Sequence, residues 1–211
     1  GVDLDVHGGE VVALLGENGA GKSTLIKILA GVYRPTGGSV EVGGQLFDQG
    51  IHAPQARDAG LAFVHQDLGL VGPLSVAENI AHVAGFQRRG WLISWRRQRE
   101  LAHRVLKRWE FDLDPDAPVD QLEPAQRALV AIGRALASNA RVIVFDEPSA
   151  SLPRHDVEIL FTAIDRLREA GVAILYVTHR LSEVARLASR VVVLRDGQRV
   201  ADLPVAETSA E

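Results

Sequence analysis

The chain has 211 residues, of which 46% are hydrophobic and 24% are charged, so it can bury the core of one ordinary globular domain. The formal net charge of −4 argues against binding nucleic acid through bulk positive charge, and the absence of cysteine excludes disulfides and thiolate metal sites. No apolar run approaches the roughly 18 residues that cross a membrane, and no signal peptide opens the chain.

The first predicted elements are two strands and a helix. Leu4 and Val6 alternate with polar residues, which predicts a half-exposed strand that ends in a turn at residues 8–9. The apolar residues 11–15 have the length and composition of a buried strand, and apolar residues at helical spacing over 25–29 predict a helix. The chain starts in the middle of this pattern and contains no methionine, so we expect it to be a piece of a longer protein.

Between the buried strand and the helix lies a glycine-rich loop of the form G-x-x-x-x-G-K-S/T, at residues 16–23. Its glycines let backbone N–H groups converge on an anion, and the following helix N-terminus adds partial positive charge. Lys22 would supply a charge to the phosphates of a nucleotide, and the Ser23 hydroxyl would bind Mg²⁺. An ordinary glycine-rich turn is the alternative, which the strand-loop-helix order disfavours. The predicted nucleotide-binding residues are Gly16, Asn18, Gly19, Ala20, Gly21, Lys22, Ser23 and Thr24.

The middle of the chain turns from mixed to helical character. Short strands are predicted at Ser39–Val42, stopped by two glycines, and at Leu61–Val64. From residue 68 to residue 138 apolar residues recur at helical spacing with no β-pattern, which we interpret as a helical insert in an α/β domain. Three helices are predicted in the insert. The first begins after Ser75, whose capping-box partner is Glu78; the second covers residues 96–110; the third begins at Pro124.

Strands and helices alternate again in the last third of the chain. The predicted strands are residues 142–145, 173–177, 191–194 and, after a hairpin turn at residues 196–197, 198–203; the predicted helices surround a stripe from Val157 to Leu167 and residues 181–188. The fold class is therefore α/β: a phosphate-loop NTPase core with a mainly parallel sheet flanked by helices. We divide it into core residues 1–67, a helical subdomain at 68–138 and core residues 139–211.

Two carboxylates, Asp146 and Glu147, directly follow the strand at residues 142–145. Open α/β sheets bind ligands at the carboxyl ends of their strands, and adjacent acids after a buried strand are costly without a metal or a proton to transfer. Asp146 is suited to bind Mg²⁺ through water, and Glu147 to polarise an attacking water. The alternative is an acidic helix cap, which the phosphate-binding loop makes the weaker interpretation.

These motifs and their order resemble the ATP-binding cassette (ABC) ATPase family, and the resemblance covers nearly the whole chain. It implies a truncated N-terminal antiparallel β element beside the core. Gln66 falls where the family has its Q-loop glutamine, and His179 where it has its switch histidine. The family signature, LSGGQ, aligns with Leu122, Glu123, Pro124, Ala125 and Gln126.

Four further segments are similar to carbohydrate importers of the ribose/galactose type: residues 31–35, 63–67, 74–80 and 178–181. In that group two cassettes are fused in a polypeptide of about twice this length. The second cassette of the pair usually has a degraded phosphate loop, whereas Lys22 and Ser23 are intact here. The chain therefore resembles the first cassette.

The resemblance implies ATP and Mg²⁺ as cofactors and a role for each site residue. Glu147 would be the general base, His179 would contact the γ-phosphate and sense its loss, and Lys22 would hold the phosphates. Mg²⁺ or its waters would be bound by Ser23, Gln66 and Asp146. Two cassettes would sandwich two ATP molecules, each closed over by the signature of the other cassette.

The implied function is ATP hydrolysis that drives sugar import at the cytoplasmic face of the cell membrane, with the cassette peripheral to the bilayer. The implied partners are a second cassette, transmembrane permease subunits and an extracytoplasmic sugar-binding protein. Nucleic acid is not expected. Two alternatives stay open at this point: a soluble ABC ATPase that acts on ribosomes or DNA, which the lack of excess positive charge disfavours, and a regulatory cassette with little turnover.

Three departures from the family pattern matter. Glu123 and Ala125 replace the signature serine and second glycine, so a carboxylate would face phosphate oxygens. We hypothesise that Glu123 marks a second, non-hydrolysing site and leaves the Lys22 site intact. Pro153 replaces an aspartate in the D-loop, and the aromatic residue that stacks on adenine is expected upstream of Gly1.

A basic cluster in the helical insert includes two tryptophans, Trp91 and Trp95. Its members are Arg88, Arg89, Arg96, Arg97, Arg99, Arg104, Lys107 and Arg108. A solvated outer face of the insert is the favoured explanation of such a cluster, and a contact with lipid headgroups or with nucleic acid is the alternative. An amphipathic core stripe explains the two tryptophans equally well. The net charge of the chain gives nucleic acid the least support.

Overall fold

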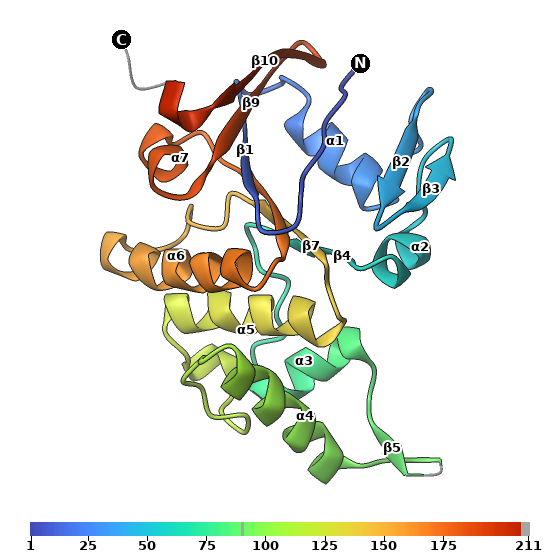
Figure 1. Cartoon of the computed structure of the whole chain (residues 1–211). Helices are drawn as coiled ribbons and strands as arrows, with labels where there is room; N and C mark the ends of the chain where they lie inside the picture. The colour runs from blue at the N-terminus through green and yellow to red at the C-terminus, as the bar shows by residue number, and fades with distance from the viewer. Residues whose placement is uncertain (90, 208–211) are drawn as a thin grey trace. The chain divides into compact units, whose positions relative to one another are not determined.

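The computed structural model describes residues 1–89 and 91–207 (Figure 1). The chain divides into two compact units. The first contains residues 1–63, 140–147 and 167–211, and the second contains residues 64–139 and 148–166. Within the described ranges, no helix has both the length and the apolar character that crossing a bilayer requires.

A sheet that has six strands among the described residues forms the frame of the first unit. Its strands, in spatial order, are β10 (Gln198–Pro204), β9 (Arg190–Arg195), β1 (Val11–Gly16), β8 (Ala173–Val177), β7 (Val142–Asp146) and β4 (Leu61–Val64). β1 is parallel to β8 and β9, and β7 is parallel to β8, whereas β10 runs antiparallel to β9. The central strands are buried on both faces, which explains their continuous apolar sequences. The predicted α/β class with a mainly parallel sheet is confirmed.

The strand predicted around Leu4 and Val6 is wrong: residues 1–10, all described, contain no strand. The alternation correctly marks a buried side, since both side chains and Val2 pack against the core of the first unit. A strand also needs a neighbour that shares a ladder of hydrogen bonds, and alternation does not supply one. The antiparallel element that the structure does contain is a separate hairpin of β2 (Ser39–Val42) and β3 (Gln45–Asp48).

Two glycines join β2 to β3, with φ of 59° at Gly43 and 83° at Gly44. This left-handed pair is the backbone of a tight hairpin turn, so the glycines continue the sheet instead of ending it. The sequence analysis missed β3 and the following short helix α2 (Ala53–Asp58). At Gly31, after α1 (Lys22–Leu29), a Cβ would lie 2.2 Å from the backbone nitrogen of Ala53, so only glycine fits there.

The other helix of the first unit with a predicted counterpart is α7 (Leu181–Leu187), which begins soon after β8. The predicted β9–β10 hairpin is confirmed, with φ of 50° at Asp196 and 72° at Gly197. A one-turn 3₁₀ helix, η2 (Val205–Glu207), follows β10. Figure 1 shows the hairpin beside β1 within this unit.

The second unit is built on α3 (Val76–Ala84), α4 (Trp95–Arg108), a 3₁₀ turn η1 (Val119–Gln121), α5 (Pro124–Ala137) and most of α6 (Arg154–Glu169). α3 begins as predicted, because the Ser75 and Glu78 side chains each bond the other's backbone N–H, at 3.2 and 2.8 Å. The absence of β-structure predicted here is wrong. β5 (Arg88–Arg89) and β6 (Leu92–Ile93) form a ladder two residues long, too short to leave an alternating pattern.

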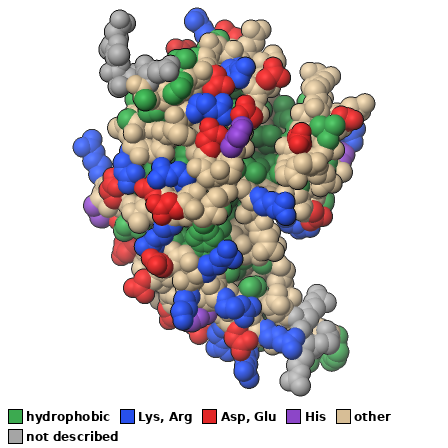
Figure 2. Space-filling view, in the orientation of Figure 1, with side chains coloured by type: hydrophobic (Ala, Val, Ile, Leu, Met, Phe, Trp, Pro, Cys, Tyr) green, Lys and Arg blue, Asp and Glu red, His purple; other side chains and the backbone are tan. Residues whose placement is uncertain are grey.

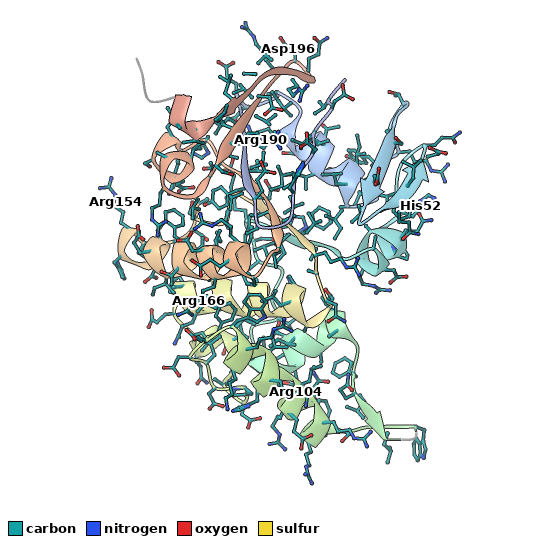
Figure 3. All side chains as sticks on the ribbon, viewed as in Figure 1. His52, Arg104, Arg154, Arg166, Arg190 and Asp196 are labelled. Carbon is teal, nitrogen blue, oxygen red and sulfur yellow. The ribbon has the colours of Figure 1, made fainter. Side chains whose placement is uncertain are left out.

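An ion-pair network joins the N-terminal segment of the first unit to the β9–β10 hairpin (Arg190 in Figure 3). The Arg190 guanidinium contacts Glu10 at 2.9 Å and Asp202 at 3.0 Å, and donates to the Asp5 carbonyl at 2.6 Å. Burial alone raises the pKa of Glu10, but hydrogen bonds from Arg190 and from the His7 N–H outweigh it, and the pKa lies below the ordinary 4.5.

Replacing Arg190 by alanine is expected to lower the free energy of unfolding by about 1–2 kcal/mol at pH 7, because the partly buried carboxylates lose their partner. The folded-state pKa of Glu10 is depressed, so its contribution is complete above pH 4.5 and is lost as the pH falls through the folded pKa. Urea unfolding at pH 7 and at pH 3 measures this. Arg195→Ala, at an exposed ion pair, is the control; an equal loss there would contradict the account.

Candidate functional site

The phosphate-binding loop connects β1 to α1 in the first unit, and its backbone requires the glycines of the motif. Gly19 and Gly21 have φ of 88° and 104°, in the left-handed region that favours glycine. At Gly16 a Cβ would lie 2.6 Å from the carbonyl oxygen of Leu194 on β9. The loop therefore passes too close to the neighbouring strand for any larger residue.

Lys22 is the first residue of α1, and only 8% of it is exposed. Its ammonium group donates hydrogen bonds to the carbonyl oxygens of Gly16 at 2.5 Å and Glu17 at 3.2 Å, so the charge is held over the loop. The helix cap is Gly21, which has no side chain to accept the first-turn N–H groups. The following Ser23 and Thr24 are exposed. Unpaired donors and a fixed cation favour an anionic ligand here.

The strand register brings the second predicted group to the same edge of the sheet. Val177 on β8 pairs with both Leu14 on β1 and Asp146 on β7, so β7 and β8 end at the same level and β1 continues to Gly16 at the same edge. The phosphate-binding loop leaves β1 there, Glu147 follows β7, and His179 lies two residues after β8. This is the edge where open α/β sheets bind their ligands.

Glu147 and His179 are in contact at this edge. The Glu147 carboxylate oxygen Oε1 lies 3.3 Å from Nδ1 of His179, and the carboxylate is the less exposed of the two groups. Glu147 has a φ of 49°, uncommon for an acidic residue, while its N–H still donates to the carbonyl of Val177 at 3.0 Å. Such a strained backbone at a polar edge is typical of functional sites.

A buried carboxylate that the sequence analysis missed fixes the backbone around His179. Glu183 on α7 is only 4% exposed and accepts hydrogen bonds from the hydroxyls of Tyr176 and Thr178, both at 2.9 Å. Arg180 lies 3.3 Å from the same carboxylate, and its N–H donates to Thr178 Oγ1 at 3.0 Å. Both neighbours of His179 are therefore held by one group. The sequence feature that could have predicted this role is an acidic residue, Glu183, in the short helix that follows the buried strand β8.

The predicted Gln66 lies in the second unit, two residues after β4, and is exposed. The backbone that follows it is clamped by Arg134 of α5, which donates to the carbonyls of Leu68 and Gly69, both at 2.6 Å. Burial lowers the pKa of this guanidinium, and the nearby Asp67 charge opposes that shift. Sequence reasoning missed Arg134, because its acceptors are backbone atoms 65 and 66 residues away.

The five signature residues lie at the start of α5, also in the second unit. Glu123 is the N-cap residue and is exposed; its N–H donates to Gln126 Oε1 at 3.0 Å. Pro124 occupies the first helical turn, where its missing N–H costs nothing, while Leu122 and Ala125 are buried. A carboxylate at the positive N-terminal end of a helix is favourable. Glu123 therefore still serves as the N-cap of α5, although it departs from the serine of the family signature.

The family described as ABC transporter matches residues 1–150 of this chain. The chain belongs to the ABC transporter family. The cassette is 45% identical to a ribose import ATP-binding protein, RbsA 3, of Rubrobacter xylanophilus, over 98% of the chain and 41% of that protein. It is 46% identical to an arabinose import ATP-binding protein, AraG 1, of Burkholderia lata, over 95% of the chain and 40% of that protein. The chain thus spans about two fifths of the length of these curated relatives.

Solved structures of cassettes share the fold. A nucleotide-free ATP-binding cassette from an ABC transporter superposes with a TM-score of 0.83 at 25% identity, over 99% of this chain and 87% of that one. CbiO1 of Clostridium perfringens, part of the cbiONQ transporter complex, gives 0.84 at 26% identity, over 100% and 83%. The family and the resemblance to sugar importers predicted from the motifs are confirmed. The roles of the individual site residues and the division at residues 67 and 138 stay predictions.

Proposed function

We propose that this cassette binds and hydrolyses ATP and that hydrolysis powers the import of a sugar, as one of two cassettes in a longer protein. The observation that carries the proposal is the meeting of the phosphate-binding loop, Asp146, Glu147 and His179 at one sheet edge. The relatives are named as ribose and arabinose import ATP-binding proteins, which supports a sugar as the imported substrate. The chain spans about two fifths of the length of these relatives, which supports a protein in which two cassettes are fused.

ATP would bind with its phosphates in the loop. Backbone N–H groups at the start of α1 would donate to phosphate oxygens, and Lys22 would exchange its carbonyl acceptors for the β- and γ-phosphates. Charge stabilisation of the transferring phosphoryl group by these donors is the larger catalytic contribution. The γ-phosphate would then lie between the loop and the Glu147–His179 pair.

Mg²⁺ fits the donors that the first unit offers, because the Ser23 hydroxyl and the Asp146 carboxylate both present oxygen, the ligand atom that Mg²⁺ prefers. The side chain of Gln66, in the second unit, carries an amide oxygen of the same chemical type. Among residues 1–89 and 91–207, no three His, Asp or Glu side chains gather as a metal site made by protein alone. Sites for Mg²⁺ usually combine one or two protein oxygens with substrate phosphates. The bound ion would neutralise charge on those phosphates.

Glu147 would act as the general base and His179 as the partner that orients it. The base removes a proton from the water that attacks the γ-phosphorus, and the bond from this phosphorus to the bridging oxygen breaks to leave ADP and phosphate. Because Nδ1 of His179 faces Glu147, Nε2 is the nitrogen left to contact the γ-phosphate. The Glu183 network would keep this imidazole in place.

The proposed partners are a second cassette, transmembrane permease subunits and an extracytoplasmic sugar-binding protein, with the cassette peripheral on the cytoplasmic face of the membrane. ATP-dependent uptake of ribose and arabinose into vesicles that contain the permease tests this assignment, with an amino acid as the control substrate. ATP hydrolysis with no coupled sugar uptake would favour a soluble ATPase instead.

The signature of this cassette would close the ATP site of its partner, and Glu123 would repel the γ-phosphate there. Replacing Glu123 by serine is therefore expected to leave hydrolysis at the Lys22 site within about twofold, because that site is closed by the other signature. Steady-state hydrolysis by the full-length protein measures this, with Glu41→Gln as an exposed control. A severalfold rise in turnover at the Lys22 site would contradict the hypothesis.

A further inference from the structure

The second unit presents a group of exposed apolar side chains that the proposed function does not use. The tip (Trp91, Leu92, Ile93 and Trp95) lies on and beside β6, where the β5–β6 hairpin leads into α4 (Figure 1). Trp91 is 85% exposed, Leu92 56% and Trp95 50%. Single exposed apolar residues are common on soluble proteins, whereas large ones gathered within five residues mark a contact surface.

The fold holds this tip outward. Gln98 of α4 is buried, accepts a hydrogen bond from the N–H of Gln87 at 3.2 Å, and donates to the carbonyl of Ala77 at 3.3 Å. Across the base of the hairpin, the Ser94 N–H donates to the Gln87 carbonyl at 2.8 Å. The ring of Trp95 also packs edge-on against Phe86, with centroids 6.2 Å apart. The buried Gln98 amide therefore fixes the base of the hairpin, so the exposed tip residues are held in a defined position.

The helix that starts at the tip has a basic outer face. α4 buries Gln98, Ala102 and Leu106 on one side, and its exposed positions include six cations but only one acid, Glu100. The basic face comprises Arg96, Arg97, Arg99, Arg104, Lys107 and Arg108. Figure 2 shows blue side chains gathered over this helix. The side chains of Arg88 and Arg89, also predicted in the cluster, lie outside the described residues.

An open hollow of about 470 Å³ lies along this face. It is lined by Arg99, Glu100, His103, Arg104, Pro115 and Asp116. The two acids in the lining are already engaged, Glu100 with Arg96 at 2.9 Å and Asp116 with Arg99 at 3.6 Å. His103 and Arg104 therefore supply the donors that a phosphate group entering the hollow would meet. Arg104 is labelled in Figure 3.

We propose that the tip and the basic face together form a surface that binds an anionic phospholipid bilayer. Tryptophan rings favour the headgroup level of a bilayer, and neighbouring aliphatic side chains such as Leu92 and Ile93 favour the acyl boundary just below it. Clustered arginines on the adjoining helix complement the negative charge of phospholipid headgroups. The net charge of the chain is −4, so the positive charge is concentrated on this face and would turn this face toward the bilayer. Nucleic acid is the weaker fit, because aliphatic tip residues gain nothing from a phosphate backbone.

Sedimentation of the full-length protein with vesicles tests this surface. The vesicles are phosphatidylcholine alone or with phosphatidylglycerol at a ratio of 7:3. We expect binding to the anionic vesicles only, a blue shift of tryptophan emission on binding, and loss of binding at high salt. The tip variant Trp91→Ser with Leu92→Ser and the basic-face variant Arg96→Gln with Arg104→Gln are each expected to lower binding at least about tenfold, with ATP hydrolysis in solution unchanged.

The matched control replaces two apolar residues of the first unit that are as exposed as Leu92, Leu46→Ser with Val200→Ser. Thermal unfolding verifies that each variant is folded. An equal loss of binding in the control, equal binding to both vesicle types, or no binding to either would overturn the proposal. Binding only to vesicles that contain the permease would assign the surface to that protein, and displacement of the vesicles by RNA would assign it to nucleic acid.

Discussion

Replacing Glu147 by glutamine is expected to slow ATP hydrolysis at this site by a factor of about 10² to 10⁴ while ATP still binds. An amide is nearly the same size as a carboxylate but does not accept a proton, so the general-base contribution is lost and the phosphate contacts remain. The contact with His179, 3.3 Å in length, can persist as a hydrogen bond to the amide oxygen. ATP should therefore accumulate on the protein.

Single-turnover hydrolysis and equilibrium binding of radiolabelled ATP, on the same preparation of the full-length protein, separate these two effects. Glu41→Gln, an exposed acid on β2, is the matched control and should behave as the wild type. If Glu147→Gln lost ATP binding and hydrolysis together, the residue would be part of the binding site or of the fold, and its assignment as base would fail.

Replacing Lys22 by alanine is expected to raise the Kd for ATP about 10- to 100-fold and to remove measurable hydrolysis. The buried ammonium is the only cation in the motif, and charged hydrogen bonds to phosphate are worth more than neutral ones. The Gly16 and Glu17 carbonyls that it bonds would also lose their donor, so a modest loss of stability is expected as well.

Lys27→Ala is the matched control for Lys22, because it removes a lysine from the same helix, where the ammonium is exposed and lies over the ring of Tyr33. Isothermal titration with ATP and thermal unfolding of both variants keep binding and stability apart. Normal ATP affinity in folded Lys22→Ala would move nucleotide binding away from this loop.

Local signals explain which parts of the fold were predictable. Ala173–Val177 and Leu61–Val64 are uninterrupted apolar runs, and both strands have these predicted bounds. The strand predicted around Leu4 failed because a ladder partner is a long-range property, and β5–β6 was missed because two residues leave no period. The helix starts at Ser75 and Pro124 were predictable because caps act within one turn.

The residues of the candidate site likewise divide into those that local sequence motifs predict and those that only long-range contacts reveal. The phosphate-binding loop and the Asp146–Glu147 pair are contiguous motifs, so the sequence was sufficient to predict them. Glu183 and Arg134 were missed because each acts on partners that only the fold brings near: hydroxyls on β8 in one case, carbonyls 65 and 66 residues away in the other. Their side chains form no motif, and only the contacts reveal what they hold in place.

The chemical identity of the nucleotide bound to full-length Glu147→Gln tests the central claim most directly. Protein mixed with ATP and Mg²⁺ and then freed of unbound nucleotide after a minute should carry ATP in the variant and ADP in the wild type. ADP on both, formed at the same rate, would contradict the account, since proton removal by Glu147 would then play no part in hydrolysis at this site.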